Sequence, residues 1–312
     1  MHSRTSPAAQ RGAALLTAMI IVTLVATLAA AMVWQQWRAV QVEAAERARA
    51  QAAWILSGAL DFAKLILKET VKPNEPTTLN GEWATPLAES RLSTFLAVDK
   101  SNADDGPEAF LSGYITDAQS RYNLFNLVKD GKVDAPERAS LERLCLSVGI
   151  DSGIADRMAD RWRDATLNAN AAAPLKPVSV SQLTWLGLDD ASAQALRPYV
   201  VLLDAATGVN VNTASKEVLA AVTGFDLATA ESVVQSRQRK PFRDVQAFAK
   251  QFNLPPEVGA RLATQSSYFE VNGRLRLIDR VLMERSLMQR LPNGQARVLE
   301  RERVSSLEQV GN

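Results

Sequence analysis

The sequence has only one histidine, His2, and only one cysteine, Cys145, among its 312 residues. A single cysteine excludes a disulfide within the chain, although it does not exclude an oxidising compartment. Histidine is the side chain best suited to acid–base work near neutral pH, and it is a frequent metal ligand. Because His2 lies in a short leader that we expect to be removed, the mature chain would have no histidine for either role.

Other signs of enzymatic chemistry are also missing. No glycine-rich loop precedes a Lys-Ser or Lys-Thr pair, and there is no dinucleotide-binding fingerprint. The formal net charge of +1 argues against a general polyanion-binding protein. Cys145 shares an apolar pattern with Leu141, Leu144 and Val148, which indicates a small core residue. We therefore expect a protein that is not an enzyme and that needs no cofactor.

One long apolar stretch lies near the N-terminus. Residues 13–34 are mostly apolar and carry no charge, which is long enough for one helix to cross a hydrocarbon core about 30 Å thick. Backbone groups in lipid need partners within the segment, so this span must be helical. Trp34 and Trp37 follow, where aromatic rings favour the membrane interface. Basic residues lie on both sides of the span, so charge alone leaves its orientation open.

The helix is predicted to continue beyond the membrane, because residues 39–68 are rich in alanine and contain no proline. Three interpretations of the N-terminus are open: a plain anchor, a secretory signal peptide cleaved at the Ala-Ala-Ala of residues 29–31, or a prepilin leader that ends at Gly12. A signal peptide should not run without a break into a long helix. The pattern therefore favours the prepilin leader.

Residues 11–16 (RGAALL) and the helix that follows resemble the leader and head of type II secretion pseudopilins. The large size of the chain resembles the minor pseudopilin K family, and residues 115–124 (ITDAQSRYNL) and 209–214 (VNVNTA) also resemble that family. The resemblance implies that a prepilin peptidase cleaves between Gly12 and Ala13 and that the amine of Ala13 is methylated. It implies a protein of the bacterial inner membrane, with one span and most of the chain in the periplasm.

The function implied by this resemblance is structural. The protein would cap the tip of a short periplasmic pseudopilus that drives type II secretion, and its partners would be the minor pseudopilins I and J. Those partners would be contacted mainly through the N-terminal helix, for which Leu56, Leu60 and Leu67 offer an apolar stripe. The same stripe would serve equally well to pack on the protein's own sheet.

Position 5 of the mature chain is Thr17, where pilin-like heads usually carry glutamate. In the family that glutamate is thought to face the N-terminal amine of the neighbour above it. A tip subunit has no such neighbour, and an unpaired carboxylate in hydrocarbon would cost about 2.5–3.5 kcal/mol or more. Thr17 can instead bond to a carbonyl of its own helix. The departure suits a tip subunit, although Thr17 can also be read as a tolerated small residue.

Hydrophobic periodicity independently predicts an α+β fold, in which the long N-terminal helix packs on an antiparallel sheet and a large all-helical domain is inserted between the strands. The expected strands include residues 111–117 and 296–304. Residues 122–127 are expected to return as the partner of 111–117, Asn272-Gly273 is expected to turn another hairpin, and residues 73–90 are expected to form a loop. The predicted segments are 1–12 (leader), 13–34 (span), 35–72 (outer helix), 73–133 with 266–304 (sheet), 134–265 (helical domain) and 305–312 (polar tail).

A short pattern recurs within the helical domain. Glycine, an apolar residue and aspartate follow one another at residues 149–151, 187–189 and 224–226, and residues 253–255 (NLP) resemble a degenerate fourth copy. Glycine can take the left-handed conformation that ends a helix, and aspartate can cap the next one. Each copy therefore predicts a tight helical hairpin. Both a true duplication and a repeated local solution remain open.

The third copy suggests a rival function, because residues 209–242 resemble a helix-hairpin-helix of DNA-binding competence receptors. That motif brings backbone N–H groups close to a phosphate at a helix N-terminus. Here Asp226 stands in place of the second glycine, and its charge opposes a phosphate. We expect Arg237, Arg239 and Lys240 to form a solvated helix end. We therefore expect no nucleic acid as a partner.

Calcium is the one metal that the resemblance suggests, since some family members bind it in the helical domain. Asp160 and Asp164 are one helical turn apart and offer two carboxylates, whereas calcium takes six to eight oxygens. Asp104 and Asp105 belong to a second acidic group that fits no EF-hand spacing. These four residues are weak candidates beside the alternative of solvated surface carboxylates.

We predict that the mature protein begins at Ala13 and carries a methylated amine, because Arg11-Gly12 lies at the edge of the apolar run. Intact-mass measurement of the protein from its native host tests this. A mature chain that begins at Met32 would instead support the signal-peptide interpretation.

Overall fold

The computed structural model describes residues 10–72, 74–92, 109–168, 172–277 and 280–304. The expectations for residues 1–9, for the calcium candidates Asp104 and Asp105 and for the tail at 305–312 therefore lie outside the described residues. The chain divides into two compact units, residues 1–55 and 56–312. The predicted mixed architecture of a long N-terminal helix and an antiparallel sheet is confirmed.

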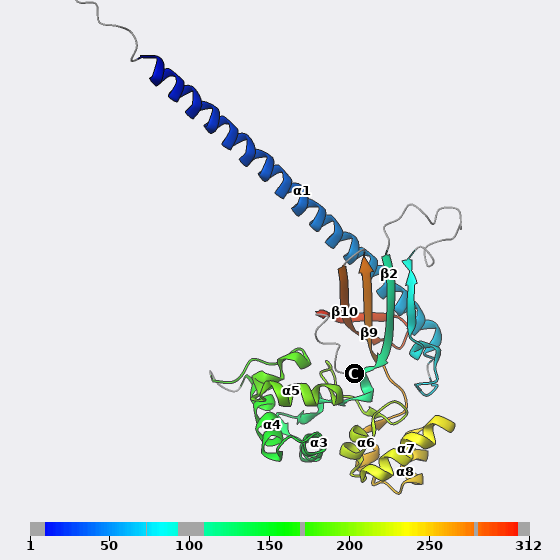
Figure 1. Ribbon diagram of the computed structural model, residues 1–312. Coiled ribbons are helices and arrows are strands. Elements are labelled where there is room, and N and C mark those ends of the chain that lie inside the picture. Colours follow the sequence, from blue (N-terminus) through cyan, green and yellow to red (C-terminus); the bar gives the residue numbers. More distant parts are fainter. Residues whose placement is uncertain (1–9, 73, 93–108, 169–171, 278–279, 305–312) are drawn as a thin grey trace, which may run out of the picture. The chain divides into compact units, whose positions relative to one another are not determined.

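Helix α1 (Gln10–Thr70) is a single helix of 61 residues, drawn in blue in Figure 1. Among the described residues it is the one helix long and apolar enough to cross a membrane, and the apolar stretch that qualifies it is not buried within the protein. Hydroxyl groups along the span bond back to carbonyl oxygens one turn earlier, for example Thr23 to Ile20 at 2.9 Å. The apolar segment thus satisfies its own polar groups, as a helix in lipid must.

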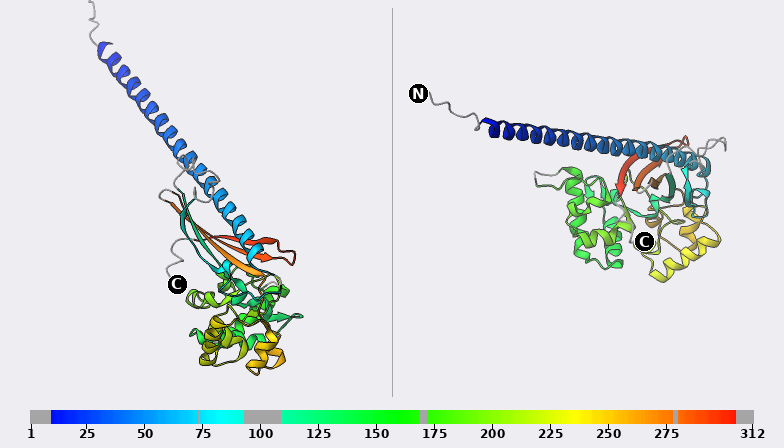
Figure 2. Two further views of the ribbon diagram at one scale, coloured as in Figure 1. Left: turned by 90° about the vertical axis from the view of Figure 1, so that its right-hand side faces the viewer. Right: turned by 45° about the horizontal axis from the view of Figure 1, so that its top comes forward.

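Five antiparallel strands form the main sheet of the second unit, in the order β1-β2-β9-β10-β11 (Figure 1). The strands twist strongly, as Figure 2 shows for β2, β9 and β10. The edge strand β1 falls in a segment that the sequence predicted to be loop, so that expectation was wrong. The bounds are β1 (Leu87–Arg91), β2 (Ala109–Asp117), β9 (Tyr268–Leu277), β10 (Arg280–Arg290) and β11 (Ala296–Val304).

The C-terminal part of α1 packs on this sheet through its own apolar stripe. Leu60 and Leu67 are buried in one cluster with Phe269 of β9 and Met288 of β10. Trp83, from the short 3-10 helix η2 (Glu82–Ala84), lies edge-on to Phe269 with ring centroids 5.3 Å apart. The stripe predicted from the sequence therefore serves the protein's own core.

The expected turn at Asn272-Gly273 was wrong, because β9 runs straight through it and pairs with β2 and β10 on either side. Strands β9 and β10 pair from Leu277 opposite Arg280 onward. Core-facing residues continue to alternate on both sides of Gly273. This alternation overrides the local turn signal. Gly273 lies opposite Gly113 of β2.

The expected return strand at residues 122–127 was also wrong. Only β3 (Tyr122–Asn123) is extended, and it pairs in parallel with β6 (Val200–Val201), while Leu124–Leu127 forms the 3-10 helix η5. The side chain of Asn123 donates to the carbonyl of Ala205 at 2.8 Å and accepts from the amide of Phe125 at 3.1 Å. These bonds divert the chain away from β2.

The segment between β2 and β9 is mainly helical, and its helices share one apolar core. Figures 1 and 2 show α3, α4 and α5 in green and α6, α7 and α8 in yellow. Three short strand pairs accompany the helices: β3 with β6, β4 (Val128–Lys129) with β5 (Lys132–Val133), and β7 (Val209–Asn210) with β8 (Leu262–Ala263). The helices are α3 (Ala135–Ser147), α4 (Ser152–Leu167), η6 (Val180–Leu186), α5 (Asp190–Leu196), η7 (Arg197–Tyr199), α6 (Lys216–Thr223), α7 (Leu227–Arg239), α8 (Val245–Gln251) and α9 (Pro256–Gly259).

The three Gly-apolar-Asp turns are confirmed. Gly149, Gly187 and Gly224 have φ values of 78°, 90° and 81°, in the left-handed region. The aspartate two residues later caps α4, α5 or α7 by accepting a backbone N–H, at 2.8, 2.7 and 2.7 Å respectively.

The two facing glycines of the sheet give a matched pair for mutation. A Cβ at Gly113 would lie 2.6 Å from the carbonyl oxygen of Asn272, whereas one at Gly273 would make an ordinary contact of 3.6 Å with Leu56. Gly113→Ala should therefore destabilise the fold by about 1–3 kcal/mol. Gly273→Ala should leave stability unchanged or raise it by about 0.4–1 kcal/mol. Denaturant unfolding of the full chain in detergent tests this, and equal losses in the two variants would contradict it.

Candidate functional site

The two later segments that carry the family resemblance meet at one buried carboxylate. Asp117, at the end of β2, accepts hydrogen bonds through Oδ2 from Asn210 at 2.9 Å, Thr213 at 2.6 Å and Ser266 at 2.6 Å. Its Oδ1 accepts the backbone N–H of Gln119 at 2.8 Å. We call Asp117, Asn210, Thr213 and Ser266 the Asp117 cluster. It ties the end of β2 to β7 and to the segment that leads into β9.

The electrostatics of the Asp117 cluster indicate a structural role. Burial raises the pKa of Asp117, and the bonds from Ser266, Thr213, Asn210 and Gln119 oppose that rise. Only 2% of Asp117 is exposed. A carboxylate that already accepts four donors and has no access to solvent is not placed to act on a substrate.

The expected solvated basic helix end is only partly correct. Arg239 and Lys240 are exposed, but Arg237 is buried and donates to the carbonyl of Val211 at 2.7 Å. Burial lowers the pKa of Arg237 to about 10. One of the three basic residues that a nucleic-acid surface would have used is therefore buried within the protein.

Asp226 lies where the rival interpretation needs a phosphate. Its carboxylate accepts the N–H of Thr229 at 2.7 Å, so the N-terminus of α7 already holds an anion. That hydrogen bond lowers the pKa of Asp226. The absence of nucleic-acid binding stays a prediction, and this geometry favours it.

The four weak calcium candidates form two pairs, of which the structure describes only one. Asp160 and Asp164 both pair with Arg163, at 3.0 and 2.8 Å, so an arginine already offsets part of their charge. Asp104 and Asp105 lie outside the described residues. Within the part of the chain that the structure describes, no group of three His, Cys, Asp or Glu side chains is arranged to hold a metal.

The residues singled out at the N-terminus lie in α1. The hydroxyl of Thr17 donates to the carbonyl oxygens of Ala13 at 2.9 Å and Ala14 at 3.0 Å, as expected for a threonine that bonds to its own helix. Further along α1, Phe62 and Leu65 are 46% and 51% exposed. They lie on the side of the helix opposite Leu60 and Leu67, which the sheet covers.

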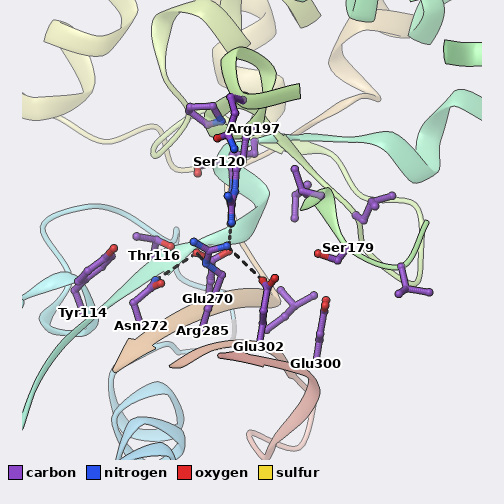
Figure 3. Close-up of a pocket in the computed structure, with 18 residues that line it drawn as sticks. Tyr114, Thr116, Ser120, Ser179, Arg197, Glu270, Asn272, Arg285, Glu300 and Glu302 are labelled. Carbon is purple, nitrogen blue, oxygen red and sulfur yellow. Dashed lines mark hydrogen bonds and ion pairs between the residues drawn. The ribbon is translucent and has the colours of Figure 1, made fainter. Parts of the chain in front are cut away.

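A cavity of about 640 Å³ lies beside the sheet, bordered by β9, β10, β11 and the segment around η6 and η7 (Figure 3). Glu270 accepts from Arg121 at 2.8 Å, and Arg285 lies 3.5 Å from both Glu270 and Glu302. Burial raises the pKa of Glu270, but Arg121 and Arg285 outweigh it and hold that pKa below its usual value. The sequence analysis did not predict this cavity. Its one local signal was the alternating charges in residues 297–303, which do not indicate a cavity by themselves.

Comparison with known proteins gives one consistent result. Residues 209–272 match the family model described as type II secretion system (T2SS), protein K. The type II secretion system protein K of Pseudomonas aeruginosa is 31% identical, covering 94% of this chain and 92% of that protein. The protein of the same name from Pectobacterium carotovorum subsp. carotovorum is 26% identical, covering 89% and 92%.

A solved structure shares the fold. It is a chain of the GspK-GspI-GspJ complex of the type 2 secretion system from enterotoxigenic Escherichia coli, with a TM-score of 0.68 and 19% identity. The similarity covers 84% of this chain and 99% of that one.

The Asp117 cluster predicts a large difference between two aspartates. Asp117→Ala removes the acceptor of three buried donors, the hydroxyls of Thr213 and Ser266 and the backbone N–H of Gln119. At about 1–3 kcal/mol for each unsatisfied group, we expect a loss of at least about 3 kcal/mol. Asp226→Ala removes an exposed helix cap and should cost about 1 kcal/mol. Denaturant unfolding of the full chain measures both. Similar losses would show that the cluster does not join the segments as described.

Proposed function

The chain belongs to the type II secretion system protein K family, and we propose that it is the minor pseudopilin that caps the tip of a periplasmic pseudopilus. The family assignment follows from 31% identity over 94% of the chain. The observation that carries the tip assignment is the uncharged Thr17 at position 5 of the mature chain, whose hydroxyl bonds to its own helix. In this role the protein acts as a structural subunit in protein secretion and catalyses no reaction.

Processing and anchoring follow from the N-terminal segment. A prepilin peptidase removes residues 1–12 by cutting between Gly12 and Ala13, and the new amine of Ala13 is methylated. The remaining apolar part of α1 holds the protein in the inner membrane as a single span, with the rest of the chain in the periplasm. The exposed, uncharged surface of α1 between residues 13 and 34 supports this arrangement.

Thr17 supports a place at the tip. In a subunit within the shaft, a carboxylate at this position could pair with the N-terminal amine of the neighbour above. A tip subunit lacks that amine, and Thr17 satisfies its hydroxyl on Ala13 and Ala14 of its own helix. The amine of Ala13 stays available to the glutamate of the subunit below.

The proposed partners are the minor pseudopilins I and J, because the similar chain of known structure was solved in a complex with GspI and GspJ. The apolar stripe of Leu56, Leu60 and Leu67 is buried on the protein's own sheet, so it cannot also serve these partners. Phe62 and Leu65 remain exposed on the other side of α1. They form the apolar contact that we assign to a neighbouring helix.

The tip position predicts an asymmetric cross-linking pattern. Cysteines placed near Ala13 should capture a partner pseudopilin, whereas cysteines near Thr17 should find no subunit above. The native Cys145 is fully buried and does not compete for the reagent. Cross-linking in cells with an assembled secretion system, followed by mass spectrometry, gives the result. Copies of this protein stacked on one another along the shaft would refute the tip assignment.

A further inference from the structure

Another cavity, of about 290 Å³, lies between α1 and the sheet, within the second unit. Ala59 and Phe62 line it from α1, and Leu87 of the edge strand β1 lines it from the sheet. Gly113 and Gly273, which face each other on β2 and β9, form part of its wall. Because neither glycine has a side chain, the sheet is hollow at this point.

This cavity offers mainly apolar surface to an occupant. Its lining includes Glu284 and Ser286, but their polar groups already interact within the chain. The hydroxyl of Ser286 donates to Oε1 of Glu284 at 3.4 Å, and the guanidinium of Arg301 lies 3.5 Å from the same oxygen. A charged group that entered the cavity would lose its water without meeting an unpaired opposite charge. The matching occupant is therefore apolar.

An exposed glycine lies beside this cavity, in the interior of α1. A Cβ added at Gly58 would enter open space, so the fold of the described chain gives no steric reason for a glycine there. Glycine in a helix interior is less stable than alanine, but it lets the backbone of another helix approach closely. Phe62, one turn later on the same side of α1, is 46% exposed and borders the cavity.

We propose that a helix of a partner subunit comes closest to α1 at Gly58 and inserts one large apolar side chain (leucine, methionine or an aromatic residue) into the cavity beside Phe62. Packed helices commonly insert side chains between those of the facing helix. Phe62 supports this occupant, because it borders the cavity and also belongs to the exposed side of α1 that the proposed function assigns to a neighbouring helix. The inference rests on that proposed function, and it adds where the two helices are closest and what the partner inserts.

The test uses the full chain and the minor pseudopilins of its own system, purified in detergent. The dissociation constant for the partners is measured for Gly58→Leu, which blocks the close approach, and for Ala59→Leu, which partly fills the cavity. The control is Lys68→Leu, because the side chain of Lys68 is 57% exposed on another side of α1. In parallel, the chain is co-expressed with the partners and carries a photoreactive amino acid in place of Leu87, which lines the cavity. Mass spectrometry identifies what this residue captures.

Gly58→Leu and Ala59→Leu should each weaken binding by about 10-fold or more, as at the well-packed centre of an interface, whereas Lys68→Leu should bind as wild type. Gly58→Leu should also unfold at the same temperature as wild type or higher, because leucine favours a helix more than glycine does and its side chain enters open space. A merely structural role of Gly58 would not combine weaker binding with retained stability. Position 87 should capture a partner peptide that has a large apolar residue at the cross-linked point.

Unchanged binding in both Gly58→Leu and Ala59→Leu would overturn the proposal. The same conclusion would follow if position 87 captured only detergent, lipid or a second copy of this chain while the partners co-purify. In either case the partners still bind, so the proposed function would stand. A wild-type chain that binds neither minor pseudopilin would instead count against the proposed function.

Discussion

The structure of the second unit depends on placing one buried carboxylate among enough donors. Asp117 lies at the end of β2, and its partners Asn210, Thr213 and Ser266 come from segments 93 to 149 residues away. Desolvation of a carboxylate is costly, so its donors must all be in place together. This requirement explains why residues 115–124 and 209–214 carry the family resemblance together. The first segment supplies Asp117, the second supplies Asn210 and Thr213, and Ser266 completes the cluster.

The same joint makes the helical segment and the sheet parts of one structure. Gln119, two residues after Asp117, accepts the N–H of Ser267 at 2.6 Å and donates to the carbonyl of Gly208 at 3.3 Å. The chain therefore enters and leaves the helical segment through neighbouring hydrogen bonds. Beyond the joint, α1 presents Leu60 and Leu67 to the sheet and leaves Phe62 and Leu65 exposed. One helix can thus belong to the core on one side and remain available to a partner on the other.

Sequence reasoning succeeded where the signal was local and failed where the partner was distant. The strands β2 and β11 and the left-handed glycines Gly149, Gly187 and Gly224 were predicted because each follows from residues within a few positions. The turn predicted at Asn272-Gly273 was wrong, because the pairing of β9 with β2 and β10 outweighs the local turn signal. The predicted exposure of Arg237 was wrong for a similar reason, because the carbonyl of Val211 to which it donates lies 26 residues away in the sequence. The cavity beside Glu300 could not be predicted, because its walls come from separate strands and from the segment around η6 and η7.

The recurring Gly-apolar-Asp turns show how far local chemistry alone can produce apparent repetition. The glycines share a conformation and the aspartates share a capping bond, but the helices that follow differ in length, with 16, 7 and 13 residues in α4, α5 and α7. At residues 253–255 a left-handed asparagine, with φ of 50°, precedes α9, whose cap Pro255 makes no side-chain bond. A duplicated module would be expected to keep its helix lengths and its cap. The differences favour one local solution used repeatedly, wherever this chain ends one helix and begins another after three or four residues.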